Sequence, residues 1–109
     1  MSYRFTPGQS EGTMILKLDG PLTLSTMFAL QDELRTMKPQ ALVVDLSGSP
    51  YMDSAGLGLI MNYYVSAEHN GRKLLLAATS ERIHALLEMT KVDGVLKSFR
   101  AVEEAEASL

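Results

Sequence analysis

Hydrophobic residues along the chain follow two spacings, one typical of β-strands and the other of α-helices. Apolar side chains at every second position, or in unbroken runs, predict strands at residues 3–5, 13–19, 41–46, 73–78 and 95–99. Apolar side chains three and four positions apart predict helices at residues 25–37, 54–70, after Thr79 or Ser80, and at 101–108. Glycine and proline separate most of these segments, as at Gly20, Pro39 and Gly71.

The predicted elements indicate one α/β domain over residues 1–109. We expect a mixed, mostly parallel sheet of four to five strands with about four helices packed on it. The run at 41–46 is apolar at nearly every position, which is typical of a central strand buried on both faces. Because ligands and partners of such sheets favour the loops at the carboxyl ends of strands, the loop after residue 46 is the first candidate for a site.

The long predicted helix at 54–70 is apolar nearly all round. Such a helix is buried on more than one side, against neighbouring helices or against a partner. Its predicted core stripe consists of Leu57, Ile60, Met61, Tyr64 and Ala67. Leu59, Tyr63 and Val65 are expected on other faces.

Composition and charge exclude several classes of function. The chain of 109 residues has a net charge of −3, which argues against a direct nucleic-acid binder. It has no cysteine, which excludes disulfides, thiolate catalysis and cysteine-ligated metals. No apolar run approaches the ~20 residues of a membrane span, and no signal peptide is visible. We therefore expect a cytoplasmic protein without membrane insertion.

Residues suited to catalysis are few. His69 and His84 are isolated in the sequence, and no spacing suggests a metal site or a cofactor motif. A hydrolase using Asp53 or Ser54 as nucleophile would need a general base that the sequence does not place nearby. We expect a protein that is not an enzyme and holds no metal or cofactor.

One segment stands out, at residues 47–58. Asp53 and Ser54 are both good N-caps for the long helix. Gly56 and Gly58 follow in its first turns, although each glycine costs a helix about 1 kcal/mol relative to alanine. Close packing of the helix start against the sheet explains such glycines, and so does a partner backbone or a phosphoryl group that needs room there.

The run from Leu42 to Leu46, followed by Asp53-Ser54-Ala55-Gly56-Leu57-Gly58, resembles the signature of the STAS domain. More closely, it is similar to the stand-alone anti-sigma factor antagonists of bacteria. The resemblance covers nearly the whole chain, including the Asn70-Gly71 helix end and the strand around Leu75. The Asp-Ser-x-Gly-Leu-Gly core after a buried strand is its specific part.

The resemblance implies a phosphorylation-switched binding protein involved in transcription regulation. Such proteins bind an anti-sigma factor that is also a serine kinase of the GHKL type, and binding releases the sigma factor. The kinase inactivates the antagonist by phosphorylating the serine after the aspartate, and a PP2C-type phosphatase reverses this. On this chain the phosphorylated residue is Ser54, and the partner-contact residues are Tyr51, Met52, Asp53, Gly56 and Leu57.

Two positions depart from the family pattern, and some members of the family use the fold without phosphorylation. Ala55 replaces a frequent second serine, so Ser54 is the only acceptor in the motif. The stretch at 21–24 is more apolar than usual in the family, which bears on the identity of the partner. The alternative is a STAS scaffold subunit without the switch, in a stressosome-like or transporter-associated complex.

Overall fold

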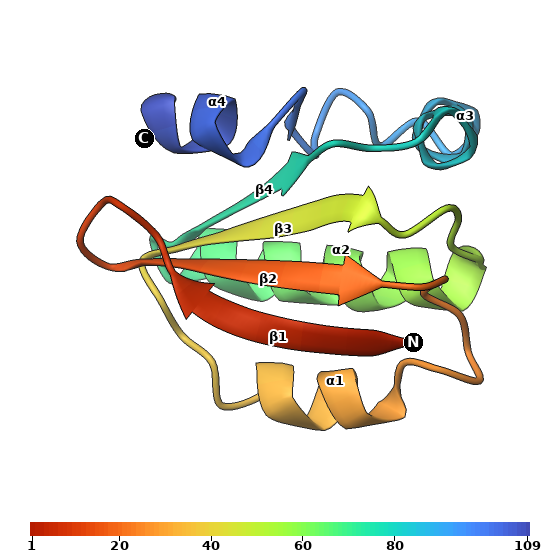
Figure 1. Cartoon of the computed structure of the whole chain (residues 1–109), viewed down its shortest axis with the longest axis horizontal. Helices are drawn as coiled ribbons and strands as arrows, with labels where there is room; N and C mark the ends of the chain where they lie inside the picture. Colours follow the sequence, from red (N-terminus) through yellow and green to blue (C-terminus); the bar gives the residue numbers. More distant parts are fainter.

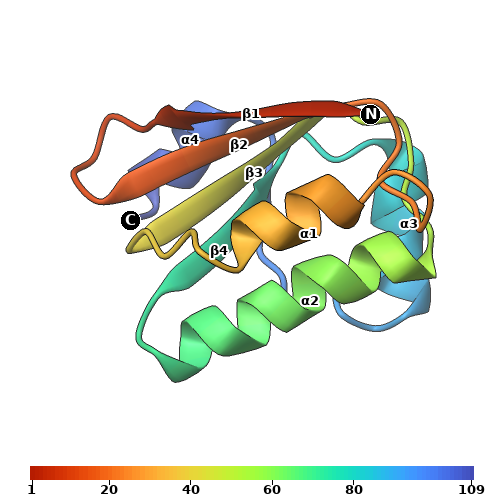
Figure 2. The ribbon, with the colours of Figure 1, turned by 90° about the horizontal axis from the view of Figure 1, so that it is seen from below.

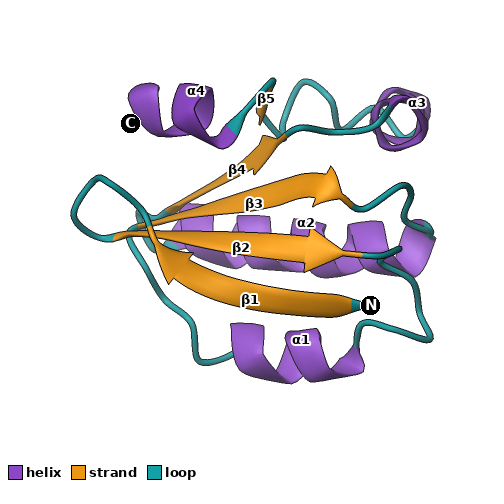
Figure 3. Ribbon diagram, in the orientation of Figure 1, coloured by secondary structure: helices purple, strands orange, loops and turns teal.

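The computed structural model describes residues 1–109 as a five-stranded sheet with helices on both faces (Figures 1 and 3). The strand order is β1-β2-β3-β4-β5, and the bounds are Ser2–Pro7, Thr13–Asp19, Ala41–Gly48, Lys73–Ala77 and Ser98–Phe99. β1 pairs with β2 in antiparallel fashion, while every other pair is parallel. The prediction of a mixed, mostly parallel sheet is therefore confirmed.

Helices cover the two faces of the sheet unequally. The helices are α1 (Phe28–Leu34), α2 (Ser54–His69), α3 (Glu81–Met89) and α4 (Val102–Ala107). Buried side chains of α1, α2 and α3 share the main core of 18 residues on one face. α4 lies on the opposite face, as Figure 2 shows, where Ala105 packs in a smaller cluster with Val43 and Leu75. None of these helices is both long and apolar enough to cross a membrane.

β3 is the central strand, and its first four residues are all buried. Leu42 and Val44 belong to the main core under α1 and α2, while Val43 contacts the α4 side. Burying each such side chain contributes about 1.5–3 kcal/mol. The apolar run therefore folds as the sequence predicts, as a strand with no face in water.

α1 is shorter than the predicted helix at 25–37. The Thr26 hydroxyl accepts a hydrogen bond from the Thr23 N–H at 2.9 Å and donates one to the Pro21 carbonyl, also at 2.9 Å. Such local side-chain bonds offer the backbone an alternative to the helix. The helix therefore begins only at Phe28, and it ends at Leu34.

β5 is also shorter than predicted, with two residues in place of five. The N–H groups of Val95 and Leu96 both donate to the carbonyl of Val92, at 2.9 and 2.8 Å. This turn uses the backbone groups that would otherwise pair with β4.

The buried stripe of α2 is shifted from the predicted one. Leu59, expected on another face, is buried in the same core as Leu34 of α1. Met61 and Tyr64, expected in the core stripe, are only partly buried, and Val65 is 59% exposed. α1 therefore covers a second side of α2, and the helix needs no partner to bury Leu59.

The start of α2 packs tightly on the segment that follows β2. Leu22 pairs with this region through its N–H to the Tyr51 carbonyl and its carbonyl to the Asp53 N–H, both at 3.2 Å. A Cβ on Gly56 would overlap the Leu22 carbonyl oxygen, whereas a Cβ on Gly58 would meet no atom within 4 Å. Packing therefore accounts for Gly56 but not for Gly58.

These two glycines give a matched pair of substitutions in one helix. Gly56→Ala should lower the free energy of unfolding by about 1–3 kcal/mol, because the methyl group must displace backbone. Gly58→Ala should raise it by about 1 kcal/mol, because it improves helix propensity without a clash. Denaturant unfolding of both variants checks the prediction, and equal shifts in both would contradict it.

Candidate phosphorylation and partner-binding site

The candidate site lies where β3 ends and α2 begins, at the carboxyl edge of the parallel strands (Figure 1). Asp53 is the N-cap of α2, in extended conformation, and Ser54 is the first helical residue. Of the two residues that could cap this helix, the structure uses Asp53. The Ser54 side chain is left exposed to solvent.

The Asp53 carboxylate joins two segments of the chain. The Gly56 N–H donates to Oδ1 at 2.9 Å, which caps α2, and the Leu24 N–H donates to Oδ2 at 3.0 Å, which holds the loop before α1. Both hydrogen bonds lower the pKa of the Asp53 carboxyl from its ordinary 3.8, and the bond from Gly56 has the larger effect.

The lowered pKa links this contact to pH. A carboxyl whose pKa is lower in the folded state stabilises the fold above its unfolded-state pKa, here 3.8. This stabilisation is lost as the pH falls through the lower folded-state pKa. At neutral pH the carboxylate of Asp53 is therefore charged and accepts both hydrogen bonds.

α3 holds the same loop from its other side. The Ser80 hydroxyl donates to the Pro50 carbonyl at 2.8 Å and accepts from the Ile83 N–H at 3.2 Å, so one side chain caps α3 and fixes the loop. The Arg82 guanidinium lies 4.5 Å from the centre of the Tyr51 ring. The residues before Ser54 are thus held by contacts from two neighbouring segments.

The structure divides the predicted site residues into two groups. Met52 and Leu57 are each 6% exposed and belong to the main core, and Gly56 is buried against Leu22. Tyr51 and Asp53 are partly exposed, and Ser54 is exposed. The buried residues fix the backbone of the site, and the exposed and partly exposed residues are accessible to another protein.

Two exposed apolar residues, not among the predicted site residues, lie in the loop held by Asp53 and at the start of α1. Leu24 is 56% exposed and Phe28 is 58% exposed, and the backbone of Leu24 bonds directly to Asp53. The signal in the sequence was the unusually apolar stretch at 21–24, whose Leu22 is buried while Leu24 is not. Leu24 thus presents an exposed apolar side chain from a backbone bonded to Asp53, and Phe28 does so at the first residue of α1.

Neither histidine is placed to activate Ser54. His69 ends the helix that Ser54 begins, about 22 Å away along the axis at the usual helical rise. His84 is exposed on α3 and pairs with Glu88 at 3.3 Å. No group of three potential metal-ligating side chains is present. No histidine or other side chain forms a hydrogen bond with the Ser54 hydroxyl, as the base of a serine nucleophile would.

Comparison with known proteins identifies a named relative. A curated anti-sigma-B factor antagonist of Staphylococcus aureus is 32% identical over 84 residues, which cover 74% of this chain and 78% of that protein. Proteins of this name are regulatory binding proteins rather than enzymes.

Solved structures share the whole fold. A structure from Thermotoga maritima superposes with a TM-score of 0.87 and 22% identity, covering 97% of this chain and 92% of that one. The Bacillus cell fate determinant SpoIIAA in its phosphorylated form gives a TM-score of 0.77 and 15% identity, covering 98% of each chain. At these identities the likeness concerns the fold.

The family model described as STAS domain matches residues 5–105, from β1 into α4. This range includes the sheet, the Asp53 cap, Ser54 and the three helices of the main core. With its family match, its relative and its fold in agreement, the chain belongs to the STAS domain family.

Proposed function

We propose that this protein is an anti-sigma factor antagonist switched by phosphorylation of Ser54. In its unphosphorylated form it binds a GHKL-type anti-sigma factor serine kinase and thereby frees the sigma factor in the bacterial cytoplasm. The observation that carries the proposal is the exposure of Ser54 directly after the Asp53 cap. The named relative and the existence of a phosphorylated SpoIIAA structure on the same fold support it.

The position of Ser54 allows a phosphoryl group without unfolding the domain. A phosphoserine adds about −1.5 to −2 charges at neutral pH. The N-terminal end of the 16-residue helix α2 favours an anion through its dipole, although the Gly56 N–H already donates to Asp53. The net charge of −3 would become roughly −5, with the change concentrated at one helix end.

The phosphoryl group would act on the partner instead. The accessible surface combines Asp53, Tyr51 and Ser54 with the exposed apolar side chains of Leu24 and Phe28. A partner that covers Leu24 reaches Ser54 as well, because the Leu24 backbone is bonded to the neighbouring Asp53, and desolvating a dianion beside the Asp53 carboxylate is costly. A loss of about 3 kcal/mol already lowers the affinity more than a hundredfold.

Resetting the switch requires access to the same side chain. Exposure of Ser54 suits a PP2C-type phosphatase, which must reach the phosphoryl group in the unbound protein. Ala55 leaves a single acceptor in the motif, so one phosphorylation event sets the state. The buried residues Met52, Gly56 and Leu57 contribute by fixing the backbone of this surface.

Substitution of Ser54 tests the switch. Ser54→Ala should bind the GHKL-type kinase of the same organism within about twofold of the wild type, while Ser54→Asp should bind at least about tenfold more weakly, since the latter places a charge in the contact. Calorimetric titration measures both affinities, and mass spectrometry after incubation with kinase and ATP should locate one phosphate, on Ser54.

A matched control places the same charge at the other end of the molecule. Ser108→Asp, beyond α4, should leave the affinity unchanged. Equal affinities for Ser54→Ala and Ser54→Asp would refute the switch. A stable large complex without phosphate incorporation would instead favour the scaffold alternative.

The apolar pair beside the site should carry much of the partner affinity. Leu24→Ser and Phe28→Ser should each weaken kinase binding by about tenfold or more, as residues at the centre of an interface do. Their fold stability should change little, because both side chains are more than half exposed. Met89→Ser is the control, since Met89 is 77% exposed on α3; an equal loss with that variant would contradict the assignment.

A further inference from the structure

A groove of about 400 Å³ lies between α1 and α2, toward the C-terminal ends of both helices. Figure 2 shows these helices running side by side in the same direction on one face of the sheet. Ser54 begins α2 and is not among the residues of the groove. The groove is therefore separate from the phosphorylation site.

Three of the chain's ten cationic side chains line this groove: Arg35, Lys38 and Arg72. Lys38 and Arg72 form no ion pair, and Arg35 has only a loose one with Asp32, at 3.7 Å. Both members of that pair are largely exposed, and such pairs contribute little. Lys38 and Arg72 are therefore not neutralised by an ion pair within the molecule, and Arg35 is neutralised only weakly.

Arg72 is held in place by its neighbours. Its Nη1 donates to the Tyr63 hydroxyl at 3.4 Å, and its guanidinium lies 5.7 Å from the centre of the Tyr63 ring. The Tyr63 hydroxyl in turn donates to the Met37 carbonyl at 2.9 Å, and burial raises its pKa, so it keeps this proton. A cation fixed in this way loses little side-chain entropy when it binds a ligand.

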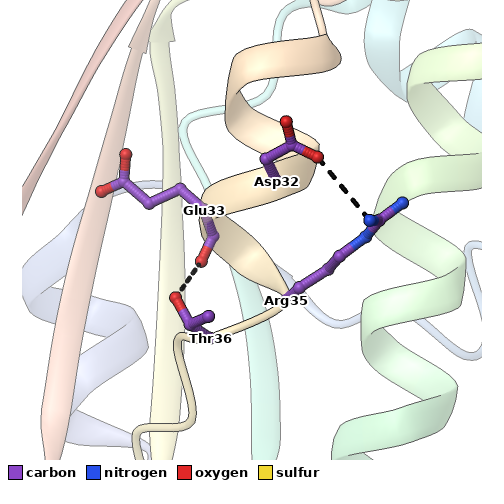
Figure 4. Close-up of polar contacts among 4 residues, drawn as sticks. All are labelled: Asp32, Glu33, Arg35 and Thr36. Atoms are coloured by element: carbon purple, nitrogen blue, oxygen red, sulfur yellow. Dashed lines mark hydrogen bonds and ion pairs between the residues drawn. The ribbon is translucent and has the colours of Figure 1, made fainter.

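Of the two neighbouring acidic side chains on α1, Asp32 contacts a cation of the groove and Glu33 does not. Figure 4 shows Arg35 extending from α1 toward α2, while Glu33 points away on the other side of α1. Glu33 accepts a hydrogen bond from the Tyr3 hydroxyl at 2.9 Å, which directs it to β1. Asp32 is therefore the carboxylate that competes for Arg35.

We propose that this groove binds a small organic phosphate. Arginine forks match phosphoryl oxygens in two-point contacts, and Lys38 adds a third positive charge. Leu34, Met37 and Leu59 provide an apolar surface for the organic part of the ligand. The volume falls within the range of roughly 300–1,000 Å³ typical of small-molecule sites.

The dimensions of the groove favour a small anion over an acidic peptide. The lining residues of α2 run from Leu59 to Ser66, a length of about 10 Å at the usual helical rise. An extended peptide advances about 3.3 Å per residue, so only about three of its residues would fit along this length. The clustered cations therefore suit a compact polyanion better than a chain.

Titration of the full-length protein with inorganic pyrophosphate in about 50 mM salt tests the site, because screening is weak there. Backbone amide NMR signals of residues 31–38 and 62–72 should shift and saturate, with little change near Ser54.

Variants of the lining residues test the same site. Arg72→Gln should weaken binding by about tenfold, because it removes a charged hydrogen bond to the ligand. Asp32→Asn should strengthen binding, because it removes the carboxylate that competes for Arg35. Arg4→Gln, which removes an exposed arginine outside the groove, is the matched control and should have no effect.

Several results would overturn the proposal. They are the absence of saturable shifts, equal weakening by Arg4→Gln, equally tight binding of citrate, or binding of a poly-glutamate peptide without binding of pyrophosphate. If Arg35, Lys38 and Arg72 only complement the helix C-termini, their substitution lowers Tm while pyrophosphate leaves the spectrum unchanged, which also refutes it. Since the test uses no kinase and no Ser54 variant, its outcome does not depend on the proposed switch.

Discussion

The Asp53 carboxylate is the contact on which the candidate site depends. One of its oxygens caps α2 and the other holds the loop before α1, so a single charged group fixes the positions of Ser54 and Leu24 relative to each other. The loop it holds contains Leu22, whose carbonyl lies against Gly56. Removing the carboxylate would therefore free the helix end and the loop that carries Leu24 at the same time.

The two glycines of α2 show how this junction combines packing with access. Gly56 is required because the Leu22 carbonyl occupies the space of a side chain. Gly58 has open space instead, and it lies one turn after Ser54, on the same face of the helix. A helix that keeps a destabilising glycine without a packing reason has room for something outside the molecule, and the partner of Ser54 is the candidate that the site suggests.

The sequence predicted the elements whose pattern is local and strong. The run at 41–46 and the Asn70-Gly71 helix end fold as expected, because buried strands and a Gly71 at positive φ leave few alternatives. The shortened α1 and β5 were not predictable from hydrophobicity, because the bonds of Thr26 and Val92 decide them. Ser54 was identified through the motif, whereas the exposure of Leu24 and the cations around Tyr63 depend on segments that meet only in three dimensions.

The two proposed anion positions are separated along α2. The groove is lined on α2 from Leu59 to Ser66, and its middle, at Asn62, lies about 12 Å from Ser54 at the usual helical rise. This distance exceeds the Debye length of about 8 Å at physiological salt, so exposed charges at the two positions repel each other only weakly. α2 is also fixed along its length by its buried side chains, which leaves little freedom for a shift at one end to move the other. On the two proposals made above, a phosphoryl group on Ser54 would therefore leave the groove free to bind an anion at the same time.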